Sequence, residues 1–120
     1  MTEFKLRGTT DEITVCDACG KKNLKLTVIL EPNDSGEAVY YGTDCAAQAL
    51  LGSKSARNRK IIGQRARAIQ FCRDRVAGGA DLKTAADDTW NRFGFPCWVN
   101  RHGDLLLAVE EQPTVIARAA

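Results

Sequence analysis

Three of the five cysteines in this chain are of a type and spacing that can bind a metal ion. Cys16 and Cys19 belong to a Cys-x-x-Cys-Gly sequence, in which two thiolates three residues apart can point at one ion from a tight turn. Gly20 permits the unusual backbone angles of such a turn. Cys45 stands at the start of an expected helix, where unpaired N–H groups favour negative charge on sulfur. We therefore expect Cys16, Cys19 and Cys45 to bind one structural zinc ion.

The order of elements around these cysteines resembles a known zinc-binding arrangement. A cysteine-containing turn, then a hairpin, then a helix that begins with cysteine is the order of a treble-clef zinc finger. More narrowly, the sequences Cys16-Asp-Ala-Cys19-Gly and Tyr41-Gly-Thr-Asp-Cys45 resemble those of small, mostly uncharacterised zinc proteins of actinobacteria and their phages. The resemblance covers residues 13–52 and fits a phage-encoded protein. It implies a structural zinc but no particular function, because treble clefs serve many functions.

The resemblance does not supply a fourth ligand. The usual position, one turn into the helix, holds Gln48 and Ala49 in this chain, and neither is a good zinc ligand. Cys97 ranks first and His102 second, because both lie on an expected C-terminal hairpin that can return to the site. Asp44 is adjacent to Cys45 but poorly placed, and Cys72 lies about 25 Å along an unbroken helix. Cys72 and Cys97 can also be interpreted as small buried residues.

A basic segment follows the expected zinc unit. Residues 53–77 contain eight Lys or Arg residues and a single acid, so they carry a net charge of +7, whereas the whole chain carries +2. On a helical wheel, one side forms a stripe that should face the core: Ile62, Ala66, Ile69 and Val76. The opposite side carries the candidate nucleic-acid-binding residues: Arg57, Lys60, Arg67 and Arg75. Phe71 shares that side, where it can stack on a base or pack against the C-terminal hairpin.

Two interpretations of this basic side stay open. It can be a solvated outer face, or a surface whose arginines donate hydrogen bonds to phosphates. The scarcity of acids favours phosphate binding, because solvated helices commonly interleave Glu or Asp to form pairs four residues apart. We therefore expect a binding protein for nucleic acid, DNA or RNA, and not an enzyme.

Two other classes of function are weighed against nucleic-acid binding. An adaptor for a host or partner protein would use the acidic third helix, with Asp81, Asp87 and Asp88, and the apolar strand at residues 105–107. A zinc hydrolase would use an open fourth position on the metal to bind water. The sequence shows no catalytic constellation, since its single histidine, His102, lies near no recognisable nucleophile or general base.

The length of 120 residues indicates one domain. The sequence contains both segments with the pattern of strands and segments with the pattern of helices, which indicates the α+β class. We expect strands at residues 4–7, 24–30 and 38–41, with a turn at 31–36 and a short helix at 45–51 that is capped by Thr43 or Asp44. Helices follow at 55–77 and 82–92, the latter with an inward face that includes Trp90, and then a hairpin of residues 96–99 and 104–109. The expected subdivision is a zinc unit (13–52), a basic helix (53–77), a helix plus hairpin (81–110) and a frayed tail (112–120).

The expected compartment follows from what the sequence lacks. No apolar run approaches the ~20 residues of a membrane-spanning helix, and the first residues are polar rather than apolar like a secretory leader. An odd number of cysteines and the absence of a leader argue against a disulfide framework and for metal binding. We therefore expect a cytoplasmic protein without a membrane partner.

Overall fold

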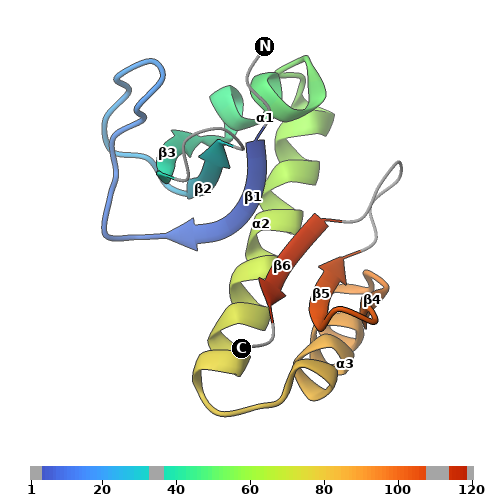
Figure 1. The fold of residues 1–120 in the computed structure, drawn as a ribbon. Coiled ribbons are helices and arrows are strands. Elements are labelled where there is room, and N and C mark those ends of the chain that lie inside the picture. Colours follow the sequence, from blue (N-terminus) through green and yellow to red (C-terminus); the bar gives the residue numbers. More distant parts are fainter. Residues whose placement is uncertain (1–3, 33–36, 108–113, 119–120) are drawn as a thin grey trace. The chain divides into compact units, whose positions relative to one another are not determined.

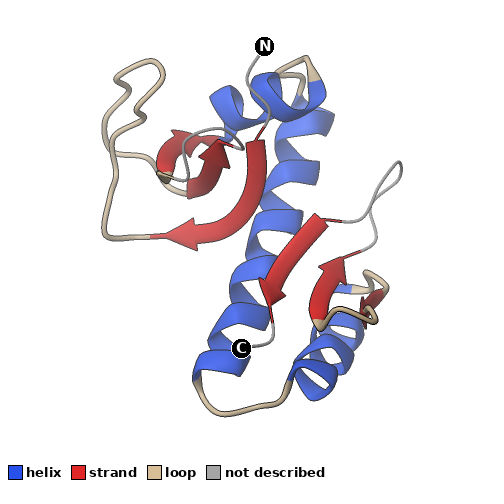
Figure 2. Cartoon of the chain, viewed as in Figure 1, coloured by secondary structure: helices blue, strands red, loops and turns tan. Residues whose placement is uncertain are grey.

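The fold combines helices with antiparallel sheets, as expected for the α+β class. The computed structural model describes residues 4–32, 37–107 and 114–118 (Figure 1). Within these residues, three helices and two three-stranded antiparallel sheets are present (Figure 2). In chain order the elements are β1 (Phe4–Thr10), β2 (Thr27–Pro32), β3 (Val39–Gly42), α1 (Thr43–Leu51), α2 (Ala56–Ala77), α3 (Leu82–Phe93), β4 (Cys97–Val99), β5 (Asp104–Leu107) and β6 (Thr114–Arg118).

The chain divides into two compact units. The first, Met1–Arg67, contains the sheet β1-β2-β3, α1 and the first half of α2. The second, Ala68–Ala120, contains the rest of α2, α3 and the sheet β4-β5-β6. Helix α2 therefore runs through the boundary between the units. The assignment of the chain to a single domain, with segments 13–52, 53–77, 81–110 and 112–120, stays a prediction.

The first sheet has β2 at its centre. Leu30 of β2 lies opposite Leu6 of β1 and Val39 of β3, and Leu30 and Val28 are fully buried. Helix α1 packs against β2 and β3 and contributes Ala46 and Ala47 to this core. Because β-branched and aliphatic residues fit a half-buried pleated surface, the sequence places these strands almost correctly. Strand β1 extends to Thr10, and β2 begins later than the predicted residue 24.

The helix ends follow the capping rules with one exception. Gly52 ends α1 and Gly94 ends α3, each in the left-handed conformation that favours glycine. Asp81 caps α3, since its side chain accepts a hydrogen bond of 2.7 Å from the backbone N–H of Thr84. The predicted cap of α1 was wrong. The helix begins at Thr43, so Gly42 takes the cap position and no side chain caps it.

The second unit contains the predicted C-terminal hairpin. Strands β4 and β5 pair through Cys97 opposite Leu107 and Val99 opposite Leu105, and α3 packs against both strands. Residues 114–118 form β6, which pairs with β5, so the prediction of a frayed tail was wrong for this segment. Residues 112–113 and 119–120 of that tail, residues 108–110 after β5 and residues 33–36 of the predicted turn lie outside the described residues.

The cores of the helices match most of the predicted inward faces. Ile62, Ala66 and Ile69 of α2 are buried. The prediction was wrong for Trp90 of α3, which is 48% exposed, whereas Thr89 beside it is fully buried. Within the described part of the chain, no helix combines the length and the apolar character that crossing a membrane requires.

Candidate metal centre

A tight turn presents the first two cysteines. The backbone N–H of Gly20 donates to the Cys16 carbonyl at 2.8 Å, and the N–H of Cys16 donates to the Lys21 carbonyl at 2.9 Å. Gly20 has a φ of 77°, a left-handed conformation that a residue with a Cβ adopts only at a cost. This closed loop, residues 16–20, therefore holds Cys16 and Cys19 on one turn, as the Cys-x-x-Cys-Gly sequence predicts.

The loop is fixed to the edge of the first sheet. The N–H of Asp17 donates to the Tyr40 carbonyl at 2.8 Å, and the N–H of Tyr40 donates to the Asp17 carboxylate at 2.9 Å. This reciprocal pair attaches the loop to β3, two residues before that strand ends and α1 begins. Because Cys45 is the third residue of α1, the strand end carries the helix and its cysteine to the loop.

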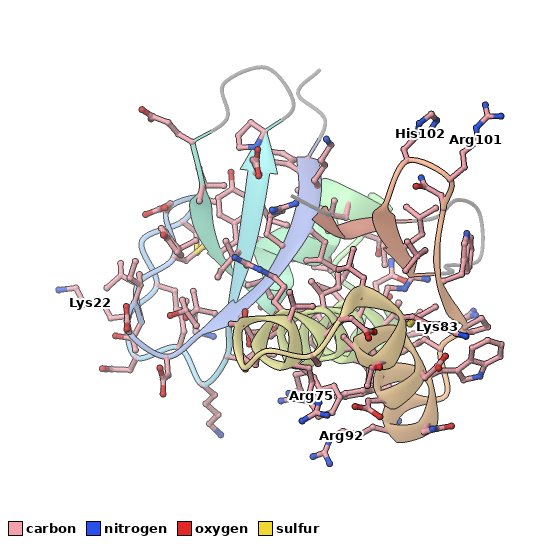
Figure 3. The ribbon with its side chains drawn as sticks, turned by 60° about the horizontal axis from the view of Figure 1, so that its bottom comes forward. Lys22, Arg75, Lys83, Arg92, Arg101 and His102 are labelled. Carbon is pink, nitrogen blue, oxygen red and sulfur yellow. The ribbon has the colours of Figure 1, made fainter. Side chains whose placement is uncertain are left out.

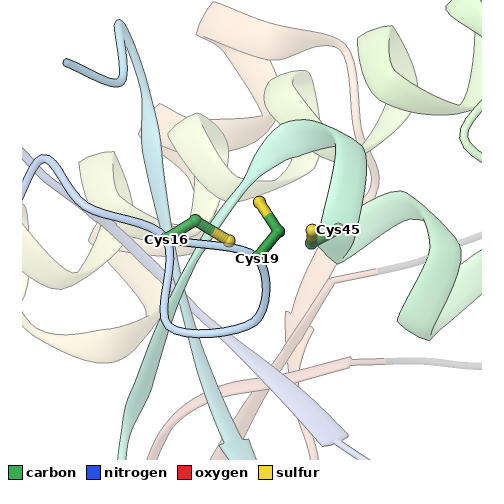
Figure 4. Close-up of side chains that lie close together, drawn as sticks. All are labelled: Cys16, Cys19 and Cys45. Carbon is green, nitrogen blue, oxygen red and sulfur yellow. The ribbon is translucent and has the colours of Figure 1, made fainter. Parts of the chain in front are cut away.

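The three cysteines form a cluster. Their Sγ atoms all lie within 4.8 Å of one another, with Cys16 and Cys19 from the loop and Cys45 from the first turn of α1 (Figure 4). A tetrahedral zinc ion with bonds of about 2.3 Å requires sulfurs about 3.8 Å apart, so a small inward shift completes the site. All five cysteines are free thiols, and a cluster of thiolates selects soft ions over calcium or magnesium. The cluster can therefore hold a metal ion.

The environment of the cluster favours one thiolate and disfavours three. Burial raises the pKa of Cys16, but hydrogen bonds from the backbone N–H groups of Gly42, Cys19 and Ala18 outweigh it, and the net shift from 9.0 is downward. Burial, together with the hydrogen bonds and charges of the two neighbouring sulfurs, raises the pKa of Cys45 to about 12. Three thiolates cannot share this space without a cation, which is the electrostatic condition that a bound metal ion satisfies.

The predicted fourth ligands are not members of the cluster. Within the described residues, no further Cys, His, Asp or Glu joins Cys16, Cys19 and Cys45. The Asp44 carboxylate lies 3.4 Å from Arg59, and His102 is exposed in the turn between β4 and β5 (Figure 3).

Cys97 and Cys72 belong to the second unit, and both are buried. The Cys97 thiol donates to the Phe95 carbonyl, with sulfur and oxygen 3.3 Å apart, and burial raises its pKa to about 12. Burial also raises the pKa of Cys72, whose thiol is hydrogen-bonded to Thr89. The surroundings of Cys72 and Cys97 thus agree with the interpretation of both as small buried residues. The choice of Cys97 as the fourth ligand stays a prediction.

The predicted nucleic-acid-binding residues have different surroundings. Arg57, Lys60 and Arg67 are exposed on the first half of α2. Arg75 instead donates from Nε and Nη2 to the Asp88 carboxylate of α3, at 3.0 and 2.7 Å. Phe71 is half-buried, with its ring centroid 5.7 Å from that of Phe93 and the Arg92 guanidinium over its face. Of the four predicted contact residues, the three in the first half of α2 are therefore exposed and form no ion pair within the described part of the chain, whereas the charge of Arg75 is compensated by Asp88.

A pocket of about 740 Å³ lies beside the cysteine cluster, entirely within the first unit. Its lining includes all three cysteines and two of the predicted contact residues, Lys60 and Arg67. Four further cations of the lining were not among the predicted contact residues: Lys21, Lys25, Lys54 and Arg59. Lys54 and Arg59 belong to the basic segment 53–77, whereas no local pattern indicates that Lys21 and Lys25 line a pocket together with residues of α2.

Comparison with known proteins identifies no relative of this chain. No protein-family model matches the chain, and neither a curated protein nor a solved structure shows significant similarity to it. The function therefore has to be argued from the site itself.

Proposed function

We propose that this chain is a zinc protein in which Cys16, Cys19 and Cys45 bind one structural zinc ion in a treble-clef arrangement. The soft donor set and the spacing of the sulfurs support zinc. The ion would join the 16–20 loop to α1, two segments that are otherwise connected through β3. A role in stability rather than catalysis fits the surroundings, because Asp44, the one carboxylate that lines the pocket, is ion-paired with Arg59.

The second part of the proposal is that the protein binds nucleic acid through the basic first half of α2. One observation carries it: exposed cations of α2 and of the segment that follows the 16–20 loop line the same pocket. Cations that belong to a merely solvated face have no reason to converge from separate segments. Phosphates of DNA or RNA are the abundant polyanions that such a cluster recognises, irrespective of sequence.

A protein adaptor is the second candidate, supported by a different observation. In the second unit, α3 and β4 pack together and carry exposed apolar side chains: Trp90 at 48%, Trp98 at 40% and Val99 at 37%. Exposed tryptophans are frequent at protein interfaces. A phage-encoded adaptor for a host protein would use this surface, whereas a hydrolase would need a general base that the pocket lining does not offer.

Metal content and salt dependence test the two parts of the proposal separately. Purified protein should hold about one zinc ion per chain by elemental analysis. Binding to DNA or RNA should weaken steeply with salt, because neutralised phosphates release counterions. Replacing Arg57 and Arg67 together by alanine should reduce the log–log salt slope by roughly 2 on duplex DNA.

The control is Asp87→Ala, which removes an exposed charge from α3 and should leave nucleic-acid binding intact. Asp88 is unsuitable as a control, because its loss would release Arg75. A protein that binds neither DNA nor RNA at low salt would leave the adaptor as the better function. A folded protein without zinc would contradict the metal site.

A further inference from the structure

The basic pocket beside the cysteine cluster has the form of a site for an anionic ligand larger than a single phosphate group. Its volume of about 740 Å³ lies within the range of sites for small organic ligands. Its cations come from three segments: the residues that follow the 16–20 loop, the connection before α2, and α2 itself. They are Lys21, Lys25, Lys54, Arg59, Lys60 and Arg67.

The charge of the pocket is poorly compensated. Asp44 is its one carboxylate and lies 3.4 Å from Arg59, so this pair is neutral. In the part of the chain that the structure describes, the other five cations form no ion pair with a carboxylate. A dication bound by three thiolates would add a single negative charge. The pocket would therefore stay strongly positive with zinc in place, which favours a ligand with more than one negative charge.

The residues that line the pocket suit a negatively charged group better than a nucleobase. Its apolar part consists of Leu24, Leu26 and Gly63, and no aromatic residue lines it. Sequence-tolerant binding of bases within a site depends on stacking against aromatic rings, which this pocket lacks. Gln64 and Asn23 supply amide groups that suit phosphate oxygens as well as bases.

A phosphate within a nucleic-acid strand and a phosphate at its end differ in charge and in steric access, and this pocket can distinguish both. An internal phosphodiester carries one charge and has a sugar on each side, so it suits an open groove. A terminal phosphate monoester carries a charge of about −1.5 to −2 at neutral pH and can enter a concave pocket end-on. Several ammonium and guanidinium donors around it give charge-assisted hydrogen bonds, the strong class.

We propose that this pocket binds the terminal phosphate of a nucleic-acid strand. This inference rests on the proposed nucleic-acid binding and makes it specific, because Arg57, an exposed cation of the first half of α2 outside the pocket lining, would then contact the strand beyond its end. The zinc site has a part in the recognition. A bound ion would join the 16–20 loop to α1, and the loop leads directly into Lys21, so the ion would fix the position of this lysine at the pocket.

The test compares two oligonucleotides that differ only in one end. The zinc-loaded protein is titrated with a single strand that carries a terminal phosphate and with the same strand ending in a hydroxyl. We expect about tenfold tighter binding of the phosphorylated strand, the factor that one additional charge-assisted hydrogen bond supplies. Equal affinities would overturn the inference and leave nucleic-acid binding in place.

Two neighbouring lysines provide a matched control. Lys21 lines the pocket, whereas Lys22 is exposed but absent from the lining, and it points away from the fold (Figure 3). Lys21→Gln combined with Lys60→Gln should abolish the preference for the phosphorylated end. Lys22→Gln should keep the preference while weakening both strands equally. If both variants keep it, the pocket is not the site.

A mononucleotide separates the pocket from the strand. Adenosine monophosphate and adenosine share a base and a sugar and differ in the phosphate monoester. Calorimetry should detect binding of the first alone, with loss of binding in the Lys21→Gln and Lys60→Gln double variant. If neither oligonucleotide binds but the mononucleotide does, the nucleic-acid proposal fails and the phosphate pocket stands. If the mononucleotide also fails to bind, the phosphate pocket is refuted as well.

Discussion

At the scale of single residues, the three clustered cysteines differ in their surroundings. Cys16 is buried and receives three backbone N–H groups, whereas Cys19 is exposed and Cys45 half-buried. Burial raises the pKa of Cys16, but the backbone hydrogen bonds outweigh it and lower the pKa, whereas burial and the neighbouring sulfurs raise the pKa of Cys45 to about 12. Cys16 is therefore the more easily deprotonated of these two cysteines.

Cys16→Ser should abolish stoichiometric zinc binding and destabilise the first unit. A structural zinc ion contributes about 10–16 kcal/mol in small peptides, which is comparable to the whole stability of a typical domain, about 5–15 kcal/mol. Elemental analysis and circular dichroism check this. Cys72→Ser is the matched control, because it removes an equally buried thiol in the second unit and should leave zinc content unchanged.

Arg75 and Arg67 should behave differently despite their shared side of the helical wheel. The Arg75 guanidinium already donates twice to Asp88, so its charge is compensated, whereas Arg67 lines the open pocket. Arg67→Ala should lower the salt slope of nucleic-acid binding by about 1, and Arg75→Ala should leave it almost unchanged. Slopes measured over a range of salt concentrations decide this. An equal effect of both changes would mean that the ion pair opens on binding.

The candidate site could be predicted where chemistry depends on local spacing. The Cys-x-x-Cys-Gly turn and a helix starting near Cys45 are local patterns, and they were enough to bring three sulfurs together. Lys21 and Lys25 were missed because their role depends on which surface they face. That surface is set by the hydrogen bonds of Asp17 to Tyr40, which join positions 23 residues apart. A pairing at that distance is not visible in local sequence patterns.

At the scale of elements, the helices were predicted better than their neighbours. Caps at Asp81, Gly52 and Gly94 are local signals, and they fix the ends of α1 and α3. The inward face of α3 was predicted incorrectly at Trp90, because the neighbouring polar residue, Thr89, is buried in its place. A threonine can be buried when its hydroxyl group forms a hydrogen bond within its own helix. Thr89 does so by donating to the Ala85 carbonyl at 2.7 Å. Strand β6 was missed although its sequence contains three consecutive β-branched residues, Thr114, Val115 and Ile116, which favour a strand; it pairs with β5.

Gly63 lies in the interior of α2, where glycine is unfavourable. A Cβ added there would lie 3.6 Å from Cδ2 of Leu26, an ordinary van der Waals contact. Gly63→Ala should therefore raise the free energy of unfolding by about 1 kcal/mol, the difference in helix propensity. Urea unfolding measures it. Gly20→Ala gives the opposite result, a loss of about 1–2 kcal/mol, because its φ of 77° strains any residue with a Cβ.

At the scale of the whole molecule, the two units depend on the metal ion to different degrees. The core of the first unit includes Val28, Leu30 and Ile62, and the whole cysteine cluster belongs to this unit. The second buries side chains from α2, α3 and β4 that include no member of the cluster: Ala68, Ile69, Cys72, Ala85, Ala86, Thr89 and Cys97. It also has the Arg75–Asp88 ion pair and the contact of Phe71 with Phe93 between two helices. Because all three cysteines of the cluster belong to the first unit, the loss of a bound metal ion should destabilise that unit more than the second.

Removal of the metal should therefore unfold the molecule in parts. With a strong chelator, amide protons of the 16–20 loop, β2, β3 and α1 should lose their protection from hydrogen exchange. Those of α3, β4 and β5 should keep most of theirs, because none of these elements contributes to the cysteine cluster. Helix α2 should lose protection in its first half, up to Arg67, and keep it beyond Ala68.

Three outcomes separate the possibilities. Graded loss along α2 supports two units of different stability joined by one helix. Uniform loss along the chain would mean that the units fold as one cooperative body, so the metal ion would stabilise the second unit as well. Unchanged protection in chelator would mean that the cluster is not needed for folding. Cys16→Ser without chelator should reproduce the graded pattern, which ties the effect to the cluster and not to the chelator itself.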